Sequence, residues 1–258
     1  MYSEISIRLL KVHPKNTDYF SELPTEKYHE VKQSIAAHGI RDPLKVLSDY
    51  TVIAGHQRLR IAKELDIEKV PVVVLDVSLA EAEYLLIADN EERRQGCDNP
   101  MKKARRAEFL KRYWGIREGR PSKLGNNFLV KTMTDIADAI NEDERTTKNL
   151  LKLNDLIAPL QDLVSTGKLS QTAAYSLAFL PQDEQKDLLG VLGDAGICGL
   201  SVKDAQGLRA ELNVIQKEKE TLALRLTELQ EERTLLSDQL SDLQTTEPVF
   251  VTLRTRQI

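Results

Sequence analysis

The sequence has little of what marks secreted, metal-bound or membrane-spanning proteins. Its 258 residues include two cysteines, Cys97 and Cys198, which lie far apart and form no metal-binding or redox motif. No apolar run approaches the roughly 20 residues that span a bilayer. Residues 1–8 alternate like a strand and lack the apolar core of a signal peptide. We therefore expect a cytoplasmic protein with reduced thiols and no membrane partner.

Aromatic residues are also scarce. They make up 5% of the sequence, whereas hydrophobic residues make up 41%. That hydrophobic content is enough to bury cores, and the shortage of aromatic residues favours helical structure. A chain of this length fits two modest domains and an extension.

Charge is unevenly distributed, although the net charge is only −4. Residues 101–131 hold ten Lys or Arg against two Glu, a balance of +8, and residues 182–247 hold seven bases against fourteen acids, a balance of −7. A basic segment beside an acidic one indicates a nucleic-acid partner for the basic part. The alternative is that the basic run is only the solvated face of a helix.

A strand that passes through a glycine into a helix lies at residues 51–65. Thr51–Ala54 is rich in β-branched residues, Gly55 breaks the strand, and a helical pattern follows with Leu59, Ala62 and Leu65 on one stripe. The first N–H groups of a helix lack partners within it, so such a turn can hold an anion. The same turn carries His56, Arg58 and Arg60, and arginine suits phosphate oxygens. The alternative is a surface turn with solvated arginines.

The first ninety or so residues predict a small domain of interleaved strands and helices. The sequence pattern predicts strands at 5–10, 44–47, 51–54 and 70–77, and helices at 25–38, from 56 onward, and from 79 to about 94. Gly39 supplies the C-terminal stop of the first helix.

The remainder of the chain is predicted to be helical. A basic helix opens at Pro100 and is expected to run to about Arg117, and a polar loop follows at 119–127. The block 131–192 has helical patterns, with breaks at 141–143, 154–155, Gly167 and Pro181. The predicted domains are 1–98, 99–198 and 199–246, with a tail at 247–258.

Residues 133–153 have the pattern of a helix-turn-helix. A first helix at 135–140 would lead to Asn141, which tolerates the left-handed conformation of a turn. Asp143 is suited to the N-cap of a second helix at 144–153. Polar side chains near the start of that helix would face outward and reach base edges in the major groove: Arg145, Thr146, Lys148 and Asn149. The alternative is an ordinary helical hairpin.

The last segment has the strongest periodicity in the chain. Apolar residues recur every seven positions at Leu208, Ile215, Leu222, Leu229, Leu236 and Leu243, and Leu212, Leu226 and Leu240 complete alternating steps of four and three. This repeat indicates a coiled coil. Lys219 and Arg233 take the two remaining core positions, where polar groups lower stability but help to fix register. The helix is expected to end at 245–248, and the alternative is a helix packed back on its own domain.

Three short boxes in this chain resemble those of the ParB family. Residues 55–60, Gly-His-Gln-Arg-Leu-Arg, resemble the phosphate-binding box of the ParB/sulfiredoxin-like fold, which reads roughly Gly-Glu-Arg-Arg-x-Arg. The glycine and the last two arginines match, while His56 and Gln57 stand where the family has Glu and Arg. Residues 39–43 resemble the nucleotide-base loop of the family. Residues 89–93 resemble its Glu-Asn-x-x-Arg box, with Asp in place of the first Glu.

The resemblance covers roughly residues 5–192, and it implies both a fold and a function. The implied fold is an α+β N-terminal ParB/sulfiredoxin-like domain, an all-α helix-turn-helix domain and a C-terminal coiled coil. In the family, CTP with magnesium closes a dimeric clamp on DNA, and slow hydrolysis reopens it. The implied nucleotide ligands are Gly39, Pro43, Gly55, His56, Gln57, Arg58, Arg60, Asn90, Arg93 and Arg94, and the implied magnesium ligands are Asp89 and Asn90.

The implied partners are double-stranded DNA and a second copy of the chain, paired through the coiled coil at the nucleoid. The process would be partition or regulation of a chromosome, plasmid or phage. Two other classes stay open. One is an enzyme of the same N-terminal fold, such as a nuclease or a nucleotide-dependent kinase with His56 as base; sulfiredoxin chemistry would need a cysteine where His56 and Gln57 stand. The other is a coiled-coil adaptor that has lost nucleotide binding.

Overall fold

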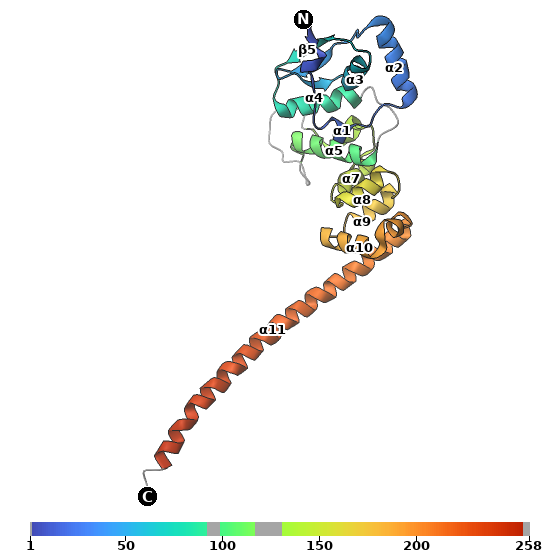
Figure 1. Cartoon of the computed structure of the whole chain (residues 1–258). Helices are drawn as coiled ribbons and strands as arrows, with labels where there is room; N and C mark the ends of the chain where they lie inside the picture. Colours follow the sequence, from blue (N-terminus) through green and yellow to red (C-terminus); the bar gives the residue numbers. More distant parts are fainter. Residues whose placement is uncertain (1, 92–98, 117–130, 255–258) are drawn as a thin grey trace. The chain divides into compact units, whose positions relative to one another are not determined.

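The computed structural model describes residues 2–91, 99–116 and 131–254 (Figure 1). Contacts divide the chain into two units, Met1–Ala205 and Gln206–Ile258. Within the described ranges, no helix combines the length and apolar character that a bilayer span requires.

Among the residues that the structure describes, five strands form one mixed sheet. They are β1 (Ser3–Ser6), β2 (Lys11–Val12), β3 (Leu44–Leu47), β4 (Thr51–Ala54) and β5 (Lys69–Leu75), in the order β1-β5-β3-β4-β2. β3 runs parallel to β5 with Leu44 opposite Val72, and antiparallel to β4. Every residue of β4 is buried. The next helix therefore starts from a strand that is fixed on both faces.

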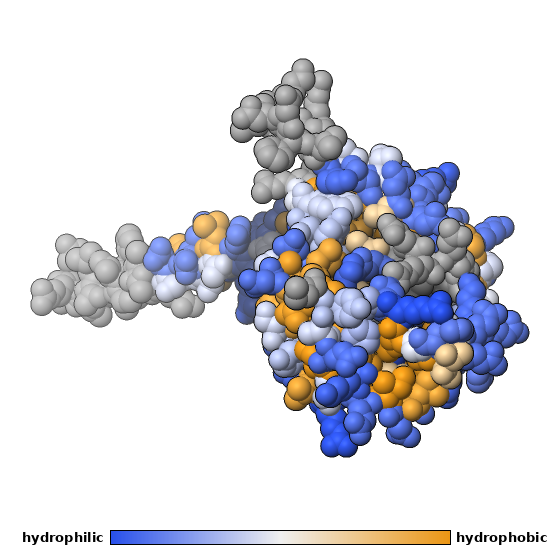
Figure 2. Space-filling view, turned by 90° about the horizontal axis from the view of Figure 1, so that it is seen from above, coloured by the Kyte–Doolittle hydropathy of each residue, from blue (hydrophilic) through white to orange (hydrophobic). Residues whose placement is uncertain are grey.

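The helices of the sheet domain are η1 (Ile7–Leu9), α1 (Asn16–Tyr19), α2 (Thr25–His38), α3 (His56–Glu64) and α4 (Leu79–Glu91). Helix α3 contacts β3 and α4 contacts β4 (Figure 1). Leu59 and Ala62 of α3 are buried in the same cluster as Leu44 and Val72 of the sheet. Hydrophilic side chains cover much of the face shown in Figure 2, with hydrophobic side chains between them.

The predicted bounds of β3, β4 and α2 are confirmed residue for residue. The strand predicted at 5–10 is wrong in its second half, because the chain turns into η1 there. The Ile7 N–H donates to the Glu68 carbonyl at 3.1 Å, and the Leu10 N–H donates to the Ile7 carbonyl at 3.3 Å. The turn carries the chain from β1 to β2, at the opposite edge of the sheet.

The helical part of the chain has seven helices within the described ranges. They are α5 (Pro100–Tyr113), α6 (Met133–Ala139), α7 (Glu144–Leu153), α8 (Ala158–Ser165), α9 (Gln171–Leu177), α10 (Gln182–Cys198) and α11 (Val202–Arg254). The predicted breaks at 141–143, 154–155, Gly167 and Pro181 all fall between helices or at their caps.

Two of the predicted helix ends are wrong. Helix α5 stops before Arg117, because Gly115 adopts φ 65° and the Ile116 N–H donates back to the Lys111 carbonyl at 2.9 Å. This is the Schellman arrangement that ends a helix at a left-handed residue. Helix α11 continues past Pro248 to Arg254. A proline inside a helix removes one backbone bond and bends the helix without always ending it.

Basic side chains of α5 bind the end of α1. Lys102 Nζ donates to the Phe20 carbonyl at 2.7 Å, and Arg106 Nη1 donates to the Tyr19 carbonyl at 2.6 Å. The Arg106 guanidinium also lies 5.0 Å from the centroid of the Phe20 ring and is fully buried. The last carbonyls of a helix lack partners within it, and cations stabilise them. Two charges of the basic run therefore hold the sheet domain against α5.

Other polar groups of α5 bind the helices that follow. Lys103 makes an ion pair with Glu142, in the turn between α6 and α7. Asn154 Nδ2 donates to the Ala104 carbonyl at 3.0 Å, and Arg105 donates to Gln161 at 3.3 Å. The predicted divide at residues 98 and 99 stays a prediction, because α5 contacts both neighbours within one compact unit.

We expect Arg106→Ala to lower the free energy of unfolding by about 2–4 kcal/mol, since it removes a buried side chain and leaves a buried carbonyl unpaired. Arg112→Ala is the matched control. Arg112 is exposed on the same helix, and its loss should change stability by less than about 0.5 kcal/mol. Urea denaturation of both variants measures the difference. Equal effects would contradict a structural role for Arg106.

Candidate functional site

Gly55 is the point from which the candidate site is built. It caps α3 with φ 100°, a conformation that glycine adopts without strain. A Cβ placed there would lie 3.0 Å from Leu44 Cγ and 3.3 Å from Arg58 Cζ. The first backbone bond of α3 runs from the Leu59 N–H to the Gly55 carbonyl at 2.9 Å. The N–H groups ahead of it therefore lie at the positive end of the helix.

Arg58 ties this helix start to the loop before β3. Its Nη1 lies 2.8 Å from Asp42 Oδ2 and donates to the Pro43 carbonyl at 3.3 Å, and it also binds the Asp42 carbonyl. The side chain is largely buried. The loop that resembles the nucleotide-base loop is therefore held against the box that resembles the phosphate box.

A cavity of about 370 Å³ opens beside this contact, and we call it the Pro43 cavity. It lies between α2, the loop before β3, the start of α3 and the end of α4. The predicted site residues that line it are Pro43, Gly55, His56, Gln57, Arg58 and Asp89. Three segments distant in sequence thus meet at one cavity, whose size is typical of small-molecule sites. Lys27 and Glu30 of α2 also line it, and no sequence signal pointed to them.

Asp89 makes an ion pair with Lys45 of β3, with 2.5 Å between Nζ and Oδ2. Within the described residues, no group of three or more His, Cys, Asp or Glu could hold a metal ion. Magnesium is commonly bound through one or two carboxylates together with substrate phosphates. The Lys45 ammonium already neutralises the charge of the Asp89 carboxylate. Asp89 therefore fits a magnesium ligand only if substrate phosphates bind the ion together with it.

Other predicted ligands lie elsewhere. Gly39 ends α2 with φ 70° and does not line the Pro43 cavity. Asn90 belongs to α4, but its side chain lies outside the described part of the chain, as do Arg93 and Arg94. Their proposed roles stay predictions.

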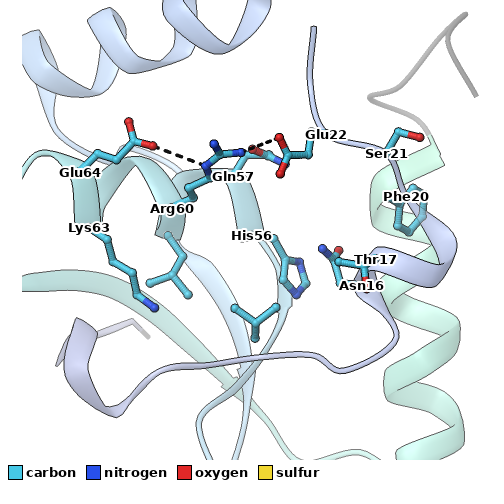
Figure 3. Close-up of a pocket in the computed structure, with 12 residues that line it drawn as sticks. Asn16, Thr17, Phe20, Ser21, Glu22, His56, Gln57, Arg60, Lys63 and Glu64 are labelled. Carbon is cyan, nitrogen blue, oxygen red and sulfur yellow. Dashed lines mark ion pairs between the residues drawn. The ribbon is translucent and has the colours of Figure 1, made fainter. Parts of the chain in front are cut away.

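Arg60 lines a second cavity of about 430 Å³, which we call the Phe20 cavity. His56 and Gln57 line both cavities, whereas Phe20, Lys63 and Glu64 line only this one (Figure 3). Residues two apart on a helix point about 200° away from each other, so Arg58 and Arg60 separate. The residues of the box at 55–60 therefore line two separate cavities.

Ion pairs hold Arg60 in place. Its Nη1 lies 2.9 Å from Glu22 Oε2 and its Nε lies 3.4 Å from Glu64 Oε1, as the dashed lines in Figure 3 show. Its guanidinium lies 4.9 Å from the centroid of the Tyr28 ring. Glu64 also accepts hydrogen bonds from Lys32 at 2.8 Å and from Tyr28 at 2.7 Å. This network joins α2 to α3. It also engages the guanidinium of Arg60, which the family pattern assigns to phosphate binding.

Two predicted features of the turn between α6 and α7 are confirmed, whereas α6 spans Met133–Ala139 instead of the predicted 135–140. Asn141 has φ 53°, and the Glu142 N–H donates back to the Ala137 carbonyl at 2.9 Å. Asp143 caps α7, because its side chain accepts the Thr146 N–H at 2.9 Å. Glu142, within this turn, makes an ion pair with Lys103 of α5.

The four residues predicted to face DNA differ in their surroundings. Arg145 and Lys148 are exposed, and Thr146 and Asn149 are half-buried. Lys148 Nζ lies 2.6 Å from Glu144, and the Thr146 hydroxyl donates to Asp143 at 2.5 Å. The structure gives Arg145 and Asn149 no side-chain hydrogen bond to another described residue. These two are the most available donors on this face of α7.

The chain is similar in sequence to known proteins. Residues 3–90 match the family model described as the ParB N-terminal domain. The chain is 29% identical over 194 residues to the chromosome-partitioning protein ParB of Myxococcus xanthus, which covers 74% of this chain and 58% of that protein. It is 26% identical over 216 residues to the chromosome-partitioning protein Spo0J of Thermus thermophilus, which covers 83% of this chain and 72% of that protein.

A similar solved structure is the C-terminally truncated chromosome-partitioning protein ParB from Caulobacter crescentus complexed to the centromeric parS site. It is 20% identical, covers 81% of this chain and 99% of that chain, and has a TM-score of 0.47. The match spans little more than half of the first curated relatives, 58% in Myxococcus xanthus and 53% in Vibrio cholerae. The predicted α+β N-terminal domain of this family, followed by helices, is confirmed.

The Glu64 network should be visible in a pH titration. The hydrogen bond from Lys32, followed by that from Tyr28, lowers the pKa of Glu64 from 4.5 to about 2. Because the folded pKa is lowered, the ionised carboxylate contributes stability that is fully present above pH 4.5 and lost as the pH falls toward 2. We expect an NMR titration midpoint near 2 for Glu64, and a rise toward 4.5 in Lys32→Ala.

Asp135 is the control for this titration. Its pKa is also lowered to about 2, first by the hydrogen bond from Lys131, in a separate ion pair. Its midpoint should not move in Lys32→Ala. A midpoint near 4.5 for Glu64 in the unchanged protein would contradict the network.

Proposed function

We propose that this chain, whose residues 3–90 match the ParB N-terminal domain, is a DNA-binding protein of a partition system and that a nucleotide controls its binding to DNA. The family match supports the nucleotide domain. The α6–α7 turn, which follows that domain along the chain, supports the DNA-binding role. The relatives described as chromosome-partitioning proteins support the process.

The observation that carries the nucleotide site is the Pro43 cavity. It joins the loop at Pro43, the glycine turn at Gly55 and the end of α4 at Asp89. The start of α3 presents backbone N–H groups that suit a phosphate, and Arg58 supplies a planar, charged donor beside them. We propose that the phosphates lie at the start of α3 and that the base lies toward Pro43.

On the basis of the ParB resemblance, we propose that the nucleotide is CTP and that it binds with magnesium. A magnesium ion would neutralise phosphate charge, with Asp89 and Asn90 as its protein ligands. Lys45, which pairs with Asp89 at 2.5 Å, would then be released to contact a phosphate. His56 and Gln57, which replace Glu and Arg of the family box, border the site on the side of the Phe20 cavity.

We propose that α7 reads DNA in the major groove, as the second helix of a helix-turn-helix. Asp143 orders the start of α7 and thereby orients Arg145 outward. Lys102, Lys103, Arg105 and Arg106 of the basic helix all bind groups of the protein, so α5 offers less charge to DNA than its composition suggests. We also propose that α11 pairs two copies of the chain.

Calorimetric titration with CTP, ATP and GTP, each with magnesium, tests the proposal. Selective binding of CTP, strengthened or weakened by DNA, would support it. Preference for ATP would favour the kinase-like alternative, and absence of binding with and without DNA would favour an adaptor that has lost its nucleotide site.

Arg58→Ala should abolish nucleotide binding, because it removes the phosphate donor and releases the loop at Asp42 and Pro43. Arg60→Ala is the matched control. Arg60 is the same residue type in the same helix turn, but it lines the Phe20 cavity and is bound by Glu22 and Glu64. Calorimetry should show a small change for Arg60→Ala. Equal loss in both variants would contradict the assignment of the phosphates to the Pro43 cavity.

Arg145→Ala should relax sequence preference and weaken binding to the preferred DNA by about 1–3 kcal/mol, if Arg145 contacts a base edge. The control is Lys186→Ala, which removes an exposed base from α10. Fluorescence anisotropy with preferred and scrambled duplexes measures both. An equal loss on every sequence would make Arg145 a phosphate contact instead.

A further inference from the structure

Helix α11 carries most of its large apolar residues on a stripe at the protein surface, and Val214, Leu224 and Leu235 lie outside this stripe. The stripe residues between 215 and 243 are each 50–70% exposed: Ile215, Leu222, Leu226, Leu229, Leu236, Leu240 and Leu243. Figure 2 shows hydrophobic side chains at the surface of this helix, among hydrophilic ones. Together with Lys219 and Arg233, these residues follow alternating steps of four and three, which is the spacing of a two-stranded seam. Leu222 and Leu229 are at d positions of this seam, and Leu226 is at an a position.

We propose that α11 pairs with α11 of a second copy in parallel and in register, and that Lys219 and Arg233 select this arrangement by binding glutamates of the partner. The inference rests on the proposed function for the existence of the dimer and adds its direction and register. Charge complementarity along the seam carries it.

Both basic residues stand at a positions of the seam, and each follows a glutamate at the g position. The pairs are Glu218-Lys219 and Glu232-Arg233. The structure gives none of these four side chains an ion pair with another described residue. By contrast, Arg225 on the same helix pairs with Glu228 at 2.8 Å. These four charges beside the seam are therefore left for a partner.

In a parallel coiled coil, an a position packs against the same position of the partner and lies beside the partner's g position. The apolar stem of Lys219 can lie along the seam while its ammonium reaches Glu218 of the partner subunit. Arg233 reaches Glu232 of the partner subunit in the same way. Two-fold symmetry doubles each contact, so the dimer gains two ionic layers.

These layers discriminate against a shifted register. A shift by one heptad would place Lys219 of one copy beside Arg225 of the partner subunit. It would also place Arg233 of the other copy beside Arg225 of the first. Like charges at such distances repel, and a leucine layer would be broken as well. The in-register pairing avoids both effects.

An antiparallel dimer is the main rival. The antiparallel alignment with the longest apolar overlap places Leu226 opposite Leu229 of the partner subunit. Its favourable contact would be Arg225 with Glu232 of the partner subunit, but Arg225 already has Glu228 in its own helix. Lys219 and Arg233 would then face leucines. The parallel arrangement satisfies more of the charges.

Disulfide trapping in the full chain tests direction and register. In a background of Cys97→Ser and Cys198→Ser, Leu229→Cys should form a disulfide-linked dimer under mild oxidation, seen on a non-reducing gel. Glu231→Cys, which lies on the outer face of the helix, is the control and should stay unlinked. Circular dichroism of each variant checks that the helices persist.

A mixture of tagged Leu226→Cys with untagged Leu229→Cys separates the two directions. A parallel dimer links each variant to itself, whereas the antiparallel dimer links only the two different chains. Linkage confined to mixed pairs would overturn the parallel proposal. Absence of any linkage, with helices intact, would also overturn it and would favour a helix packed on its own chain.

The ionic layers have their own test by sedimentation equilibrium. Glu218→Lys with Glu232→Lys should raise the dimer dissociation constant by at least about tenfold. Glu220→Lys with Glu231→Lys makes the same change in net charge on the outer face and should have a much smaller effect. Equal weakening by both double variants would overturn the role of the ionic layers. These measurements need neither DNA nor nucleotide, so their results can be interpreted even if the proposed function is wrong.

Discussion

The left-handed conformation of Gly55 is the constraint on which the N-terminal domain depends. It lets a fully buried strand turn directly into a helix, and its missing side chain lets Leu44 and Arg58 approach the turn. The two cavities of this domain both border the first turn of α3, and Arg58 ties that turn to the loop at Pro43. A side chain at residue 55 would disturb the turn, the loop contact and the Pro43 cavity together.

The basic residues of α5 show how the same charge can serve structure instead of a partner. Lysines and arginines along one helix usually suggest a polyanion, and the composition of residues 101–131 favours that interpretation. In the folded chain, Lys102 and Arg106 bind the carbonyls at the end of α1, and Lys103 binds Glu142. These contacts fasten the sheet domain and the α6–α7 turn to a common helix. The sheet domain and the proposed DNA-binding helix are therefore connected through α5.

Helix α11 poses a different physical problem, because its leucines gain nothing from the chain while they are exposed to water. Binding of this seven-residue apolar repeat to a partner surface would lower the free energy, since burial of each leucine is favourable by about 1.5–3 kcal/mol. The sheet domain and the α6–α7 turn both lie before this helix in the chain. Pairing of two copies would bring two sets of these elements into one assembly.

The sequence by itself determined the features that depend on local chemistry. Strand β4, helix α2, the glycine stop at Gly39 and the left-handed turn at Asn141 could all be predicted, because hydrophobic period, capping and φ preference act within a few residues. The heptad repeat is likewise visible in the sequence. The meeting of the loop at Pro43 with the box at Gly55 could be expected only from the family resemblance.

Only the tertiary structure decided which charges meet. Arg58 and Arg60 look alike in the sequence, yet one binds Asp42 beside the Pro43 cavity and the other binds Glu22 and Glu64 beside the Phe20 cavity. The pairing of Asp89 with Lys45 joins residues far apart in the chain and had no sequence signal. Periodicity places a side chain on a face of its own helix, but its partner depends on how separate elements pack, and that is a property of the folded chain.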